Sequence, residues 1–135
     1  MADFAVWVKG QGSEWSGRMK EYDLKELTNE YIENAVIQGE SQFSGDFKKG
    51  NKASNKLFKI RAIMKENRDI AIEMLNILLD NENISVLSWA AGDALDLKYR
   101  DEEAEQLLKK IARMPETGIL GFIAEMELEF RGIKL

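Results

Sequence analysis

The sequence predicts an all-α protein of about six helices arranged in antiparallel hairpins. The 135 residues include a single proline, Pro115, and few runs of β-branched residues, which favours helix over sheet. Residues that cap helices recur before segments whose apolar residues have helical spacing. The connections between these segments are short, so consecutive helices are expected to be antiparallel neighbours.

The first two helices are predicted at 24–43 and 47–66. Asp23 and Glu26 have the spacing of an N-cap and the third residue of a helix. Gly45 can adopt the left-handed conformation that ends the first helix, and Asp46 can cap the second.

Four more helices are predicted at 70–79, 84–98, 102–113 and 118–131. The first three of these helices have the expected N-caps Asp69, Asn83 and Asp101, in that order. The helix at 102–113 begins with acids and ends with bases, which matches the helix dipole. Pro115 blocks its continuation, and Gly132 ends the last helix.

Residues 1–22 differ from the rest of the chain and hold two of its three tryptophans. The stretch FAVWVKG could form a short strand, but one strand has no sheet to join. We therefore assign 1–22 as an N-terminal extension or tail, or a leader added for expression, and 23–135 as the helical domain.

The composition excludes several kinds of chemistry. The sequence has no cysteine and no histidine, so zinc sites, Ser-His-Asp triads and Cys-His dyads are impossible. We predict no catalytic residues, no metal and no cofactor. The net charge of −5 does not suit nonspecific binding to nucleic acid or anionic membranes. Neither a membrane-spanning run nor a signal-peptide pattern is seen, so a cytoplasmic protein is expected.

A pattern typical of HEAT repeats spans the helices predicted at 70–79 and 84–98. The stretch LLDNENISVLSWAAGDAL (78–95) has a leucine pair, an aspartate at the turn, a valine and then small residues. It resembles a HEAT repeat, which implies a short HEAT-like α-solenoid. Leu87 replaces the arginine that usually follows the valine, which argues against long, regular stacking.

A wider resemblance covers residues 24–135. It is carried by the segments QGESQFSGDFKKGNK (38–52), LLDNENISVLSWAA (78–91) and GILGFIAEMELEFRGIKL (118–135). These are similar to a small bacterial HEAT-like family, the domain of unknown function 2019 family. That family has no established activity. The resemblance implies an association with bacterial toxin–immunity gene sets.

Trp89 lies on the polar side of the helix predicted at 84–98. At about 100° per residue it falls between Asp93 and Asp96. Packing against a neighbouring helix would explain this position, because inner helices of a solenoid contact partners on both sides. The alternative is an exposed aromatic anchor with an acidic rim, as at protein-binding hot spots.

The helix at 47–66 carries a stripe of lysines within an arc of about 100°. We name it the lysine stripe; it consists of Lys48, Lys49, Lys52, Lys56 and Lys59. Residues 47–61 contain no acid, so this is a local asymmetry on an acidic protein. One explanation is a solvated face with salt links to glutamates of the first helix, namely Glu26, Glu33 and Glu40. The other is a site for an anion or an acidic partner.

Arg61 and Asn51 fall inside the apolar arc of the same helix, which also holds Phe47, Leu57 and Phe58. A buried charge needs a partner, so we predict a structural polar link from Arg61 to Asp46 or to a residue of the first helix.

Small residues are expected at helix crossings. Gly39 and Gly50 each weaken a helix by ~1 kcal/mol relative to alanine, which a close crossing would offset. The alternative is a notch for a ligand. A close approach of a neighbouring helix is also expected at Ala90, Ala91 and Ala94.

The helix at 118–131 has two apolar stripes. One consists of Ile119, Phe122, Ile123, Met126 and Phe130, and the other of Leu120, Ala124 and Leu128. Glu127 lies between them, one turn before Arg131, in the order that favours a salt link. Glu125 and Glu129 lie on an outer ridge, where they face water or a cationic partner.

These observations predict a non-enzymatic protein-binding module. Its sharpest form is an immunity-type protein that masks a basic toxin, because opposite charges speed docking. The predicted partner-binding residues are Trp89, Asp93, Asp96, Glu125 and Glu129, and a secondary anion-binding surface consists of Lys48, Lys49, Lys52 and Lys56. The alternative is a nucleic-acid-binding or base-repair HEAT-like protein that uses these lysines with Trp89.

Overall fold

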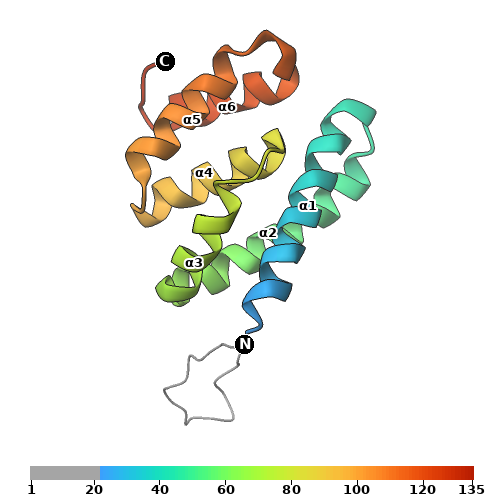
Figure 1. Cartoon of the computed structure of the whole chain (residues 1–135). Helices are drawn as coiled ribbons and strands as arrows, with labels where there is room; N and C mark the ends of the chain where they lie inside the picture. Colours follow the sequence, from blue (N-terminus) through green and yellow to red (C-terminus); the bar gives the residue numbers. More distant parts are fainter. Residues whose placement is uncertain (1–21) are drawn as a thin grey trace.

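The computed structural model of the chain describes residues 22–135, so the predicted N-terminal extension lies outside the described part except for Tyr22. The described elements are α1 (Leu24–Ser44), α2 (Phe47–Glu66), α3 (Arg68–Leu78), α4 (Ile84–Leu97), α5 (Asp101–Arg113), the 3-10 turn η3 (Pro115–Thr117) and α6 (Ile119–Phe130) (Figure 1). The predicted all-α class is confirmed, and the packing is consistent with a small helical bundle or solenoid. Among residues 22–135, no helix is long and apolar enough to cross a membrane.

Three of the predicted N-caps are confirmed. The Asp23 carboxylate accepts hydrogen bonds from two backbone N–H groups of the first turn of α1, at 3.0 and 3.2 Å. Asp46 accepts from the N–H of Lys49 in α2, and Asn83 accepts from two N–H groups of α4. Gly45 ends α1 with φ of 81°, as predicted.

The predicted N-caps Asp69 and Asp101 are wrong. The helix α3 begins at Arg68 and α5 begins at Asp101, so both aspartates lie within the first helical turn. Neither helix has a side-chain hydrogen bond at its cap. An acid in the first turn also interacts favourably with the helix dipole, so an aspartate there resembles an N-cap in the sequence. The predicted helix starts were therefore one or two residues too late.

The helices α1 and α2 pack along each other, and so do α5 and α6. Figure 1 shows α4 between these two pairs, where it contacts both α1 and α5. Two of the three predicted hairpins are therefore observed. The third, α3 with α4, is less extensive, because α3 has only 11 residues and α4 packs mainly against α5.

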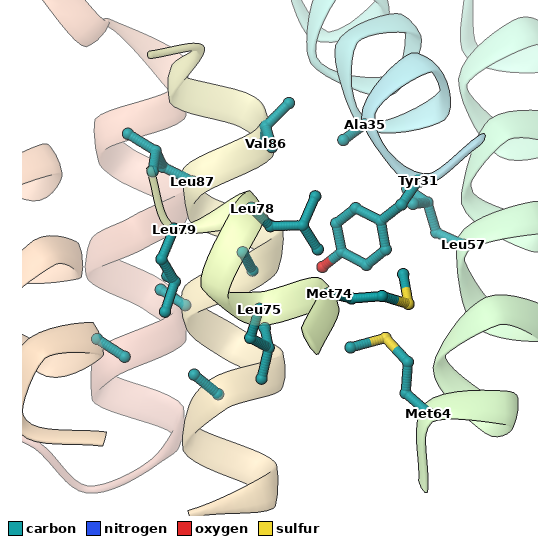
Figure 2. Packing of buried hydrophobic residues seen from close by; sticks show 14 of the residues in the cluster. Tyr31, Ala35, Leu57, Met64, Met74, Leu75, Leu78, Leu79, Val86 and Leu87 are labelled. Atoms are coloured by element: carbon teal, nitrogen blue, oxygen red, sulfur yellow. The ribbon is translucent and has the colours of Figure 1, made fainter. Parts of the chain in front are cut away.

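One apolar core receives side chains from all six helices. Its largest fully buried side chain is that of Tyr31 on α1, whose ring lies among Leu57, Met64, Met74 and Leu78 (Figure 2). Tyr22 packs against this core from its edge.

Glycines occupy two close helix crossings. A Cβ atom on Gly39 would lie 1.7 Å from Oγ of Ser85, so α1 and α4 approach closely there. A Cβ atom on Gly50 would lie 2.1 Å from Oγ of Ser41, at the crossing of α2 and α1. Both crossings are as predicted. The alanines of α4, Ala90, Ala91 and Ala94, are fully buried.

We expect Asn83→Ala to lower the free energy of unfolding by about 1 kcal/mol. The N–H groups of Ser85 and Val86 would lose the side-chain oxygen that accepts from both. Urea denaturation measures the change. Asn55→Ala, at an exposed position within α2, is the matched control and is expected not to destabilise the fold. Equal stabilities of the Asn83→Ala variant and the wild type would contradict the assigned cap.

Candidate protein-binding surfaces

Asp93 does not belong to an exposed acidic rim, contrary to the prediction. Its side chain is 2 % exposed and accepts hydrogen bonds from the Tyr31 hydroxyl at 2.6 Å and from Nε of Arg61 at 2.5 Å. The prediction failed because the Asp93 side chain faces α1 and α2 instead of solvent. Asp93 is thus a buried link between three helices.

Asp93, Tyr31 and Arg61 form a hydrogen-bond network in which one carboxylate accepts from two donors. Burial raises the pKa of Asp93, and the positive charge of Arg61 and the hydrogen bond from Tyr31 oppose that rise. Burial, followed by the charge of Asp93, raises the pKa of Tyr31 well above its usual value. Tyr31 is therefore a neutral hydrogen-bond donor to Asp93 at all physiological pH values.

Arg61 forms the structural link that its position predicted, but with a different partner. It pairs with Asp93 of α4, so the predicted partners Asp46 and α1 are wrong. The predicted apolar arc of α2 was also misplaced. Of its predicted members only Leu57 is buried, while Asn51, Phe47 and Phe58 are exposed. The arc actually buried consists of Gly50, Ala53, Leu57, Ile60 and Met64.

Trp89 is half-buried and packs against the core, as the helix-packing alternative predicted. Its Nε1 donates to Oε1 of Gln38 at 3.3 Å, and its ring centroid lies 5.8 Å from that of Phe58. The guanidinium carbon of Arg61 lies 5.2 Å from the Trp89 ring centroid and 5.6 Å from that of Phe58. The position of Trp89 next to Asp93 in α4 is thus explained by Arg61, which pairs with Asp93 and makes a cation–π contact with the Trp89 ring.

Asp96 is also engaged within the fold. It accepts from Nη1 of Arg131 at 2.9 Å. Arg131 bonds at the same time to Glu127 at 2.6 Å, which is the predicted salt link, and to the carbonyl oxygen of Gly92. Arg131 therefore joins α6 to α4 and partly neutralises two acids.

The strongest apolar surface of the described chain lies on α6. We call it the α6 face; it consists of Ile119, Phe122, Ile123, Met126 and Phe130. All five side chains are exposed, with Phe122 at 60 % and Phe130 at 93 %. The opposite side of α6, with Ala124 and Leu128, is buried in the core. The helix is thus apolar on both sides, and among residues 22–135 only the side with Ala124 and Leu128 is covered.

The α6 face continues toward α1 and has an acidic border. A Cβ atom on Gly118 would lie 3.6 Å from Cε1 of Phe43, so this exposed phenylalanine of α1 lies beside the start of α6. Glu125 and Glu129 are exposed, as predicted. Within residues 22–135 neither of these two glutamates forms an ion pair.

The lysine stripe of α2 is exposed along its length. In the described part of the chain, none of its lysines pairs with Glu26, Glu33 or Glu40 of α1, so the predicted salt links are not observed. Among residues 22–135, the lysines of the stripe form no ion pair with any acid.

The α6 face was missed as a binding surface, although its signal was present in the sequence. Two apolar stripes on one short helix cannot both face the same neighbouring helices. The pattern did not tell which stripe is covered, because that depends on how α5 and α4 approach.

No protein-family model, curated protein or solved structure matches this chain, so the resemblance to the domain of unknown function 2019 family stays a prediction.

Proposed function

We propose that this protein is a non-enzymatic protein-binding module and that the α6 face is its binding surface. The observation that carries the proposal is the exposure of five apolar side chains on one side of one helix. A surface helix typically has one apolar stripe that faces the core, and α6 has a second, exposed stripe. Contiguous exposed apolar patches on folded proteins mark interaction sites. A partner that covers the α6 face would complete its burial.

The acidic border favours a basic partner. Glu125 and Glu129 lie beside the α6 face, and the chain carries a net charge of −5. Opposite charge speeds the docking of a basic protein. In its sharpest form the proposal is an immunity-type protein that masks a basic bacterial toxin. The resemblance to the domain of unknown function 2019 family implies an association with toxin–immunity gene sets, and the acidic charge favours a basic partner. Of the predicted surface residues, the proposal retains Glu125 and Glu129. It leaves out Asp93, Asp96 and Trp89, because their side chains make contacts within the fold.

A second candidate is nucleic-acid binding through the lysine stripe. The exposure of its lysines supports this alternative. The base-repair version is weaker, because Asp93 and Trp89 are both occupied by Arg61. Phosphate contacts by Lys48, Lys49, Lys52 and Lys56 would make such binding strongly salt-dependent.

Affinity capture tests the proposal. Immobilised full-length protein is exposed to a lysate of the source organism, and the retained proteins are compared with those held by a Phe122→Ser/Phe130→Ser variant. We expect at least one protein whose retention falls by about tenfold or more in the variant, because exposed aromatics at hot spots contribute strongly.

Phe47→Ser/Ile77→Ser is the matched control, because it removes two exposed apolar side chains outside the α6 face. The expected protein is retained by this control. Identical retention by all three immobilised proteins would contradict the α6 face as the binding surface. Recovery of nucleic acid that Lys48→Glu/Lys52→Glu abolishes would favour the second candidate.

A further inference from the structure

We infer that the α6 face binds an amphipathic helix that carries lysines or arginines beside its apolar stripe. This inference rests on the proposed function and adds the chemical class of the partner. It follows from the shape of the face, from the helical hydrogen bonding of its backbone and from the charges along its two borders.

The shape of the α6 face fits one helix. Its residues are Ile119, Phe122, Ile123, Met126 and Phe130, and each has another member of the face three or four positions away. They fall within an arc of about 100° and extend for about 16 Å along α6. Such a narrow, straight stripe has the pattern of one side of a helix–helix seam. A partner helix of about three turns would cover it.

The backbone of α6 excludes an extended peptide that adds as a strand. Strand addition requires the free N–H and C=O groups of a sheet edge. Residues 119–130 use these groups within the helix, and residues 22–135 contain no strand. Side-chain packing is therefore the mode of binding that the α6 face offers.

The two borders of the α6 face differ in charge. On one border, Glu127 is paired with Arg131, which also binds Asp96. On the other border, Glu125 and Glu129 are exposed and pair with no base among residues 22–135. The uncompensated charge is negative and lies on one side, so the partner helix has its bases on that side.

A second copy of this chain fits the α6 face less well. Two copies of α6 in contact would bring four exposed carboxylates, from Glu125 and Glu129 of each, to one interface. The helix α6 contains no lysine or arginine to neutralise them, and Arg131 is already shared between two acids. Like charges across an interface disfavour association.

Two synthetic 18-residue peptides test the inference. Both carry the same stripe of leucines at spacings of three and four, and they differ only in having lysines or glutamates beside it. Each is labelled with fluorescein and titrated with full-length protein, and binding is followed by fluorescence anisotropy. We expect the lysine peptide to bind at least about tenfold more tightly than the glutamate peptide.

Charge reversal locates the preference. Glu125→Lys/Glu129→Lys is expected to reverse the order of the two affinities. The matched control Glu66→Lys/Glu73→Lys changes the net charge equally at exposed acids of α2 and α3, and is expected to keep the wild-type order. Phe122→Ser/Phe130→Ser is expected to lower the affinity for the lysine peptide by about tenfold or more.

Several outcomes would overturn the inference. They are equal affinities of the two peptides, an order that Glu125→Lys/Glu129→Lys does not change, and binding that survives Phe122→Ser/Phe130→Ser. Dimers of the free protein in sedimentation velocity that are lost in Phe122→Ser/Phe130→Ser would identify a second copy as the occupant instead. If lysate capture depends on Phe122 and Phe130 while the lysine peptide fails, the proposed function stands and only the partner class is wrong.

Discussion

Arg61→Leu is expected to lower the free energy of unfolding by about 3 kcal/mol near neutral pH. The variant would leave the Asp93 carboxylate buried with only the Tyr31 hydroxyl as a partner. It would also remove the cation that lies on the Trp89 and Phe58 rings. Urea denaturation measures the loss. Lys59→Leu, which removes an exposed base from the same helix, is expected to change stability by no more than about 0.5 kcal/mol.

The cost of Arg61→Leu should depend on pH. Burial already raises the pKa of Asp93, and Arg61 opposes this rise, so its removal raises the pKa further. The folded state then binds a proton at pH values where the unfolded state has released it, and the free energy of unfolding falls as pH rises through this range. The variant should therefore lose less stability near pH 5 than near pH 8. A cost that is the same at both pH values, or greater at the lower one, would contradict the assigned ion pair.

Gly39→Ala is expected to destabilise the protein by about 2 kcal/mol, although alanine is the better helix former. The new Cβ atom would lie 1.7 Å from Oγ and 2.6 Å from Cβ of Ser85, so α1 and α4 would have to move apart. In the double variant Gly39→Ala/Ser85→Gly, part of the lost stability should return, because the clashing side chain is gone. Urea denaturation of the four proteins in this cycle gives the coupling between the two sites.

Gly92→Ala is the matched control for Gly39→Ala. Its Cβ atom would lie 3.5 Å from the nearest atom, Oε2 of Glu127, which is ordinary contact. We expect this variant to be as stable as the wild type or more stable by up to about 1 kcal/mol. Equal effects of Gly39→Ala and Gly92→Ala would show that α1 and α4 do not cross closely at Gly39.

Local signals predicted the helices well. The start of α1 at Asp23, the turn at Gly45 and Asp46, and the start of α4 at Asn83 depend on short-range capping bonds, which neighbouring residues determine. The starts of α3 and α5 were misplaced, because an aspartate suits both the cap and the first turn. Their local preference does not distinguish between these two positions.

The candidate site was only partly predictable, because it depends on contacts between distant residues. Arg61 pairs with Asp93, 32 residues further along the chain, and the helical wheel of α4 placed Asp93 on a polar side that was expected to face water. Whether a polar side faces water or another helix is decided by tertiary packing. The same limit applies to α6, where the sequence showed two apolar stripes and the packing left one exposed.

Oxidation of Met126 tests the central claim most directly. Met126 is 52 % exposed at the centre of the α6 face, whereas Met64 and Met74 are 1 % and 0 % exposed in the core. Full-length protein is given a short pulse of hydrogen peroxide with and without the protein that it captures, and each methionine sulfoxide is quantified by mass spectrometry. We predict fast oxidation of Met126 in the free protein, strong protection in the complex, and slow oxidation of Met64 and Met74 in both. Equally fast oxidation of Met126 in the free protein and in the complex would show that the partner does not cover the α6 face.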